Sequence, residues 1–302
     1  MRDATMSLWI VATLFAASVQ ALRFLLQKRL AVSGLSPAAS TFARFVYAPG
    51  VIGAGLAAWT LATGTGLPIV GTGFWPYALA GGISQILATM CVVALFAHRN
   101  FAVGIAFSKV TVLLTVATGF VVLGETVTWA DIAAMLVGLV GVLILSVPAG
   151  GGWQVLNRGS VLGLASGVFF SISAVGYRGA SLVVESDAPV LRAAVTLALV
   201  TLVQAVVLAA WLAWRDRAGL IAVFTRWRVT TLVGATSMAG SLGWFTAYTL
   251  QTAAYVNAVG QVELILSMAI SWLVLGERFS WRELLAIALV SCSVIALILL
   301  QT

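Results

Sequence analysis

The feature that most constrains the fold of this chain is an internal repeat. Residues 109–145 align without a gap on residues 261–297, an offset of 152 positions (109 to 261). The tripeptide Leu-Gly-Glu occurs at Leu123–Glu125 and again at Leu275–Glu277, and in each copy a Trp and then an acidic residue follow at the same distance. Apolar stretches share identities by chance, but a shared motif of this kind indicates a duplicated structural unit.

Each Leu-Gly-Glu turn leads into the start of a second apolar helix. A capping box at that start lets a hydroxyl accept from the amide three residues on, while an acid reaches back to the cap amide. Two such boxes are predicted: Thr128 with Asp131, and Ser280 with Glu283. The acids of the turns, Glu125 and Glu277, are then expected to face headgroups and water, where they need no buried partner.

Composition excludes a soluble protein. Hydrophobic residues make up 62% of the chain and charged residues 8%, whereas a soluble domain carries about 25% charged residues. The net charge of +7 lies in short loops between apolar runs, which is a topology signal and not a nucleic-acid groove. The single His and the scattered acids form no catalytic constellation. We therefore expect an integral membrane protein that is no enzyme, binds no nucleic acid and needs no cofactor or metal.

The number of spans predicts the architecture, because a span needs about 20 apolar residues. Ten stretches qualify: Ser7–Leu26, Pro37–Leu61, Phe74–Ala97, Ala102–Leu123, Thr128–Val147, Ser160–Val183, Pro189–Trp214, Thr230–Leu250, Ala254–Leu275 and Ser280–Leu300. A Gly-rich connection, Pro148–Gly152, separates a first copy (1–152) from a second (153–302). Five spans per copy is an odd number, so the second copy must enter the membrane in the opposite sense. The prediction is an all-α polytopic membrane protein of two inverted five-helix repeats, a construction common in secondary transporters.

Positive charges in the loops predict the orientation, since Lys and Arg are enriched on the cytoplasmic side. One predicted face carries Lys28, Arg29, Arg99, Arg158, Arg215, Arg217, Arg226, Arg228, Arg278 and Arg282. The other face carries Arg2, Arg178 and Arg192. The first face is expected to be cytoplasmic, which leaves both termini in the periplasm of an inner-membrane protein.

At the Leu-Gly-Glu motif the sequence resembles the EamA-type carriers of the drug/metabolite transporter superfamily. The resemblance extends over nearly the whole chain. It consists of the ten spans, their division into two five-span halves, and the position of the motif at the ends of spans four and nine. It implies a carrier of small organic solutes, often an exporter of amino acids or related metabolites. One departure stands out: many relatives carry Pro near the start of span four or nine, where this chain has Lys109 and Gln261.

Charged residues deep in a span are costly and mark functional sites by default. Lys109 in span four and Glu263 in span nine belong to equivalent helices and are each about 10 Å deep from opposite faces, so they are expected to bracket the midplane. Lys109 would attract a carboxylate and Glu263 an amino group, which suits a zwitterionic amino acid. Three alternatives stay open: a structural ion pair, a Lys109 side chain that extends to the interface, and a Glu263 that carries protons.

Other candidates lie along the spans. Arg23 and Arg44 are near the cytoplasmic ends of their spans and are expected to extend to the interface or to act as gates, with substrate contact as the alternative for both. The uncharged candidates for the cavity wall are Gln20, Gln85, Trp244, Tyr248, Gln251 and Asn257. Rival hypotheses to amino-acid export are a carrier of cationic drugs or amines, an anion exchanger for phosphorylated metabolites, and a membrane scaffold without transport. Monomer and homodimer both fit.

Overall fold

The computed structural model describes residues 2–32, 34–95, 108–146, 158–266 and 280–300, and these are helical apart from turns and connections. One isolated antiparallel bridge, between Val70 and Val184, is the exception among them. The helices are α1 (Arg2–Val32), α2 (Pro37–Phe45), α3 (Ala48–Thr63), α4 (Phe74–Leu95), α6 (Thr111–Leu123), α7 (Trp129–Ser146), α8 (Arg158–Leu182), α9 (Pro189–Arg215), α10 (Arg217–Thr225), α11 (Trp227–Leu250), α12 (Ala253–Val259) and α14 (Trp281–Leu300). The predicted all-α class is confirmed for this part of the chain.

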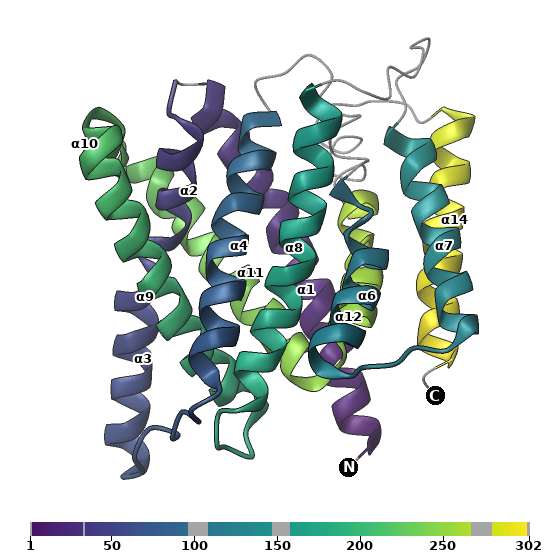
Figure 1. Ribbon diagram of the computed structural model, residues 1–302, viewed down its shortest axis with the longest axis horizontal. Helices are drawn as coiled ribbons and strands as arrows, with labels where there is room; N and C mark the ends of the chain where they lie inside the picture. The colour runs from purple at the N-terminus through teal and green to yellow at the C-terminus, as the bar shows by residue number, and fades with distance from the viewer. Residues whose placement is uncertain (1, 33, 96–107, 147–157, 267–279, 301–302) are drawn as a thin grey trace.

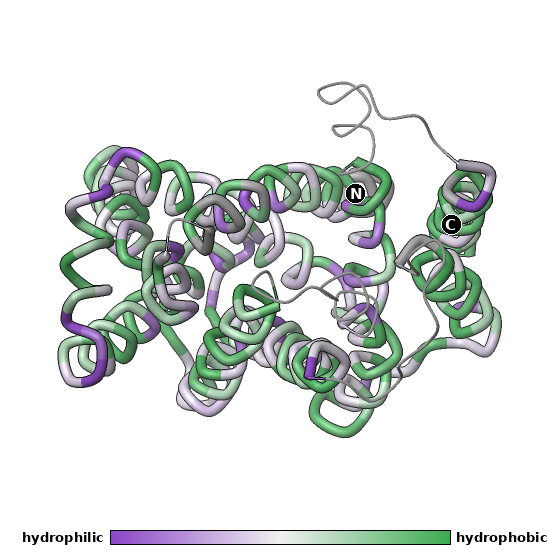
Figure 2. Tube along the Cα trace, turned by 90° about the horizontal axis from the view of Figure 1, so that it is seen from above, coloured by the Kyte–Doolittle hydropathy of each residue, from purple (hydrophilic) through white to green (hydrophobic). Residues whose placement is uncertain are grey.

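Several helices have the length and apolarity of membrane spans. Within the described residues, four segments are long and apolar enough to cross a membrane: Pro37–Thr63, Phe74–Leu95, Arg158–Leu182 and Pro189–Arg215. Shorter apolar helices occupy Leu8–Phe24, Thr111–Leu123, Trp129–Ile144, Ala253–Leu266 and Leu284–Leu300. In Figure 2 the chain trace is mostly coloured hydrophobic, with few hydrophilic positions. These observations agree with a polytopic membrane protein, while the number of ten spans stays a prediction.

The second predicted span, Pro37–Leu61, is not one continuous helix. The helix α2 ends at Phe45, and α3 begins at Ala48. Pro49 explains the interruption, because it has no amide hydrogen and its ring clashes with the carbonyl four residues earlier, that of Phe45. The break leaves Arg44 in the last turn of α2. The backbone of Arg44 therefore lies next to a helix break inside the bundle.

The fourth and ninth predicted spans are also interrupted, and at equivalent positions. Lys109 and Val110 form a turn directly before α6, while Gly260 and Gln261 form a turn directly after α12. An offset of 152 maps Lys109 onto Gln261, so the helix is interrupted at equivalent positions in the two copies. The early residues of span four, 102–107, lie outside the described residues. Discontinuous helices of this kind expose polar backbone groups where transporters bind their solutes.

Two long helix pairs form the centre of the bundle. The helix α4 packs most extensively against α8, and α1 against α11. The 152-residue offset carries α4 onto α11 and α8 onto α1, so it exchanges the two pairs. Glycines permit both close approaches: a Cβ on Gly176 would lie 2.8 Å from the Cα of Gly81, and one on Gly243 would lie 2.9 Å from the carbonyl oxygen of Ala12.

The remaining helices extend the bundle along its long axis. The α7 and α14 helices pack against each other at one end of that axis, and α3, α9 and α10 lie at the other (Figure 1). Both chain termini lie at the same end of the helices in Figure 1, which we call the terminal end. The connection between α6 and α7 reaches this terminal end as well (Figure 1).

The first predicted capping box is confirmed. The amide of Thr128 donates to Asp131 Oδ2 over 2.9 Å, and the amide of Asp131 donates to Thr128 Oγ1 over 3.2 Å. The hydroxyl of Tyr255 in α12 donates to the same carboxylate oxygen over 2.5 Å, so the cap also joins α7 to the second half of the chain. The second box involves Glu283, whose side chain lies outside the described residues.

Candidate functional site

A charged and polar cluster connects the two halves of the chain inside the bundle. Lys109 Nζ lies 3.6 Å from Glu263 Oε2. The amide of Gln20 donates to the same Glu263 oxygen over 2.7 Å, and its own oxygen accepts from Trp244 Nε1 at 3.1 Å and from Arg23 Nη2 at 3.2 Å. We call these five residues the central cluster. The expected proximity of Lys109 and Glu263 is therefore observed, and Gln20 and Trp244, predicted to line a cavity, belong to the same network.

The backbone explains how these side chains meet. Lys109 stands in the turn before α6, and Glu263 follows the turn that ends α12. A Cβ on Gly260 would lie 2.4 Å from the Trp244 ring, so glycine at this turn makes room for the indole that binds Gln20. Gln20 and Arg23 are three residues apart and therefore share one face of α1.

A second group of predicted residues lies along the same helices. The hydroxyl of Tyr248 donates to Asn257 Oδ1 over 2.8 Å, and Asn257 Nδ2 donates to Thr115 Oγ1 over 2.9 Å. The ring of Tyr248 stacks on that of Trp244 with centroids 6.0 Å apart. This chain of contacts links α11, α12 and α6, and it continues the central cluster by one helical turn.

Gln85, also predicted as a wall residue, belongs to a separate network. Its side-chain oxygen accepts a hydrogen bond from the hydroxyl of Tyr177. That hydroxyl accepts from Gln204 Nε2 at 3.1 Å, and the same nitrogen donates to the carbonyl of Gly82 at 2.9 Å. Sequence reasoning missed Tyr177 and Gln204, because a lone aromatic or amide in an apolar span is more often a packing residue than a site residue.

Arg44 does not extend to the interface as expected. It is 1% exposed and donates through Nε to Ser237 Oγ at 2.9 Å and through Nη1 to Thr89 Oγ1 at 2.7 Å. Arg23 is likewise buried, at 3% exposure. Both expectations of an interfacial arginine were wrong. Two hydroxyls and the ring of Phe45 hold the Arg44 guanidinium among the helices. The Gln20 amide oxygen and the ring of Phe24 hold that of Arg23.

The expectation for Glu125 was also wrong. Its carboxylate forms a partly buried ion pair with Arg178 of α8. The same guanidinium donates through Nη1 to the backbone oxygens of Tyr248 and Gln251, each at 2.7 Å. Gln251 therefore lies at the end of α11 and not in the central cluster. Glu277, the equivalent acid, lies outside the described residues.

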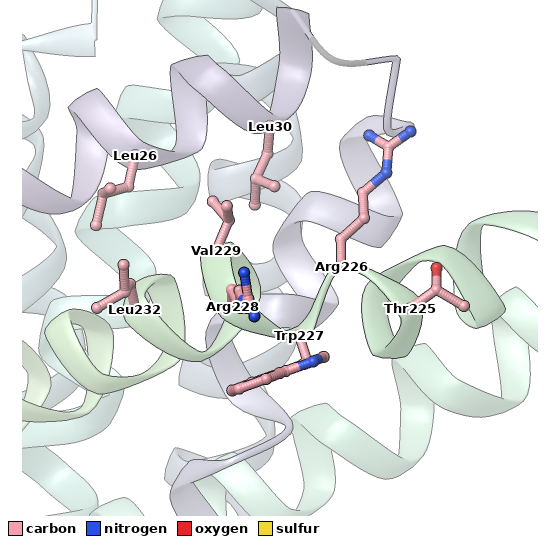
Figure 3. Close-up of a pocket in the computed structure, with 8 residues that line it drawn as sticks. All are labelled: Leu26, Leu30, Thr225, Arg226, Trp227, Arg228, Val229 and Leu232. Carbon is pink, nitrogen blue, oxygen red and sulfur yellow. The ribbon is translucent and has the colours of Figure 1, made fainter.

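A groove lies at the opposite end of the bundle from the chain termini (Figure 3). Its volume is about 650 Å³, and it forms between the last turns of α1 and the junction of α10 and α11. Its lining residues are Leu26, Leu30, Thr225, Arg226, Trp227, Arg228, Val229 and Leu232. None of them belongs to the central cluster, so this groove is not the predicted solute site.

Apolar helices of span length, buried charges and broken helices define a multi-pass membrane protein with a polar interior. Residues 157–299 match the family model of the EamA-like transporter family. Over the second half of the chain, this match confirms the resemblance predicted from the Leu-Gly-Glu motif. A comparison with curated proteins found no match.

The fold also occurs in a solved structure. A crystal structure, described only as that of a protein, aligns with a TM-score of 0.71 over 98% of this chain and 99% of that chain. The two sequences are 19% identical. At this identity the likeness shows the fold alone, and it indicates that a chain of similar length adopts the same arrangement of helices.

Proposed function

We propose that this protein is a secondary transporter that moves small organic solutes across the inner membrane by alternating access, and that amino acids or related metabolites are its exported solutes. The observation that carries the proposal is the central cluster, in which Lys109, Glu263 and Gln20 meet from both halves of the chain. A partly buried cation and a buried carboxylate at 3.6 Å provide one group for each end of an amino acid.

The proposed mechanism depends on two inverted repeats, 1–152 and 153–302. Two features support the duplication: the helix breaks at Lys109 and Gln261 are 152 residues apart, and the same offset exchanges the α1–α11 and α4–α8 pairs. In such folds one repeat rocks against the other around a fixed solute site. The solute would then replace the direct contact between Lys109 and Glu263 while the bundle changes the side to which the cluster opens.

A pair of charge-removing substitutions tests the site. Lys109→Met and Glu263→Gln keep roughly the native shape of each side chain. If the two residues form only a structural ion pair, each single change strands a buried charge and lowers the free energy of unfolding by about 3–5 kcal/mol, while the double change restores it. If they bind solute, the single variants fold and the double variant folds without transporting.

The measurement is counterflow of labelled amino acids in proteoliposomes, together with thermal unfolding of the same preparations in detergent. Arg215→Gln is a matched control, because Arg215 is an exposed cation that stacks on Trp214 outside the cluster. Normal counterflow by the double variant would reject the site. Absence of counterflow by the folded parent for every solute class would favour a membrane scaffold.

A further inference from the structure

Arg23 and Arg44 lie at the same level of the bundle, although they belong to different helices. The contacts of Gly240 with Val19 and of Gly243 with Ala16 set the antiparallel register of α1 on α11. The residue numbers of the pairs in contact there sum to between 255 and 259, so the register brings Arg23 to the level of residues 232–236 of α11. The next residue, Ser237, accepts the hydrogen bond from Arg44. The two guanidinium groups therefore lie at similar levels along α11, and their like charges repel each other.

This neighbourhood contains more positive charge than its own acids neutralise. At this level of the bundle, the buried or partly buried cations among the described residues are Arg23, Arg44 and Lys109, and Glu263 is the carboxylate beside them. Three cations and one carboxylate leave an excess of two positive charges inside the bundle. A buried charge without a counter-charge is strongly unfavourable, so an anion from outside the chain would relieve it.

Polar atoms at the same level lack partners. Among the described residues, Arg23 Nε has no hydrogen-bond acceptor, and neither the side-chain nitrogen nor the side-chain oxygen of Gln27 has a partner, although Gln27 is fully buried. Gln27 lies four residues after Arg23 and so shares its face of α1. Buried polar groups are normally hydrogen-bonded. Two of these atoms, Arg23 Nε and Gln27 Nε2, are donors, and they point to a ligand with acceptor oxygens.

We propose that Arg23 and Arg44, with the amide of Gln27, form a subsite for an oxyanion of the transported solute. The inference rests on the transport function proposed above and narrows its solute class. A neutral zwitterion would leave the excess of two positive charges in place, whereas a solute with a net charge of −1 or −2 reduces or removes it. The preferred solutes are therefore acidic amino acids or small organic diacids, with one oxyanion at this subsite and the other polar end at Lys109 and Glu263.

The test measures binding and transport with five probe compounds. L-glutamate and succinate are the anionic probes, L-alanine is the neutral zwitterion, putrescine is the cation and sn-glycerol 3-phosphate is the phosphate. Binding is measured as stabilisation of the detergent-purified protein, which rises with the logarithm of occupancy, and transport as counterflow in proteoliposomes. The variants are Arg23→Gln, Arg44→Gln and Arg44→Lys, with the exposed Arg215→Gln as control.

We expect glutamate or succinate to bind and to be transported by the parent and by Arg215→Gln. Loss of a charged hydrogen bond should weaken that binding about 10- to 100-fold in Arg23→Gln and Arg44→Gln. Arg44→Lys keeps the charge without the planar fork, so it should recover part of the affinity. Because Arg44 also joins α2 to α4 and α11, Arg23→Gln is the variant to use if Arg44→Gln fails to fold.

Other outcomes separate the two proposals. Binding of glycerol 3-phosphate in place of the carboxylates, weakened by the same variants, supports the subsite with phosphate as its oxyanion. Preference for alanine or putrescine with unchanged affinity in Arg23→Gln and Arg44→Lys overturns the subsite and leaves transport standing. Stabilisation by none of the five compounds also overturns it. Binding without counterflow overturns the transport function instead.

Discussion

At the scale of single residues, the pair of Arg178 and Glu125 joins the two halves of the chain at the terminal end. Arg178 comes from α8, and Glu125 follows the left-handed Gly124 that ends α6. The guanidinium satisfies three acceptors, one carboxylate oxygen and the carbonyls of Tyr248 and Gln251. Both side chains are only partly accessible, 14% and 13%, so water replaces little of what a substitution removes.

Removal of Arg178 should therefore destabilise the fold. We expect Arg178→Met to lower the free energy of unfolding by about 2–4 kcal/mol, since it strands a carboxylate and two carbonyls. Glu125→Gln should cost about half as much, because the two carbonyl contacts persist. The measurement is thermal or denaturant unfolding of purified protein.

A matched control separates the ion pair from the carbonyl contacts. Arg192 donates to the carbonyls of Ser181 and Leu182 at 2.9 and 2.8 Å, and it has no carboxylate within ion-pair distance among the described residues. If Arg178→Met and Arg192→Met lower the free energy of unfolding by the same amount, the ion pair with Glu125 contributes nothing to stability.

At the scale of helices, the α4–α8 contact depends on glycine. A Cβ on Gly176 would lie 2.8 Å from both the Cα of Gly81 and the carbonyl oxygen of Tyr77. These are backbone atoms, so the two helices must separate to admit a methyl group. Small residues are what permit such close packing between helices in lipid.

Gly176→Ala is expected to lower the free energy of unfolding by about 1–3 kcal/mol, the usual effect of overpacking. Gly55→Ala is the control, because a Cβ there meets nothing within 4 Å and alanine favours the helix. Unfolding of the two variants side by side measures the difference. A Gly176→Ala protein as stable as the Gly55→Ala protein would contradict the close approach of α4 and α8.

At the scale of the whole molecule, the odd number of spans per copy predicts opposite topology for equivalent positions. Thr126 follows the first Leu-Gly-Glu and Arg278 the second, 152 residues apart. With Cys91 and Cys292 replaced, single cysteines at these positions should differ in labelling by an impermeant thiol reagent in intact cells, with only Thr126→Cys labelled. Equal labelling would show that the two copies enter the membrane in the same sense.

Much of this molecule follows from local sequence patterns. Apolar runs predict helices and a membrane environment, because the bilayer requires backbone hydrogen bonds to be made within each segment. The Thr128–Asp131 cap could also be predicted, because both partners lie within one helical turn of each other in the sequence. Lys109 and Glu263 could be singled out because charges are rare in apolar spans, and the repeat itself put them on equivalent helices.

Only the tertiary structure decided which distant groups meet. Arg44 reaches Ser237 and Thr89 on two other helices, and nothing within its own span indicates that these hydroxyls would keep it from the interface. The pairing of Arg178 with Glu125 depends likewise on the rotation of α8 and on the end point of α6. Sequence periodicity determines which face of a helix is apolar. Which helix lies against that face depends on the packing of all the helices together, and that packing determines which groups a buried charge can contact.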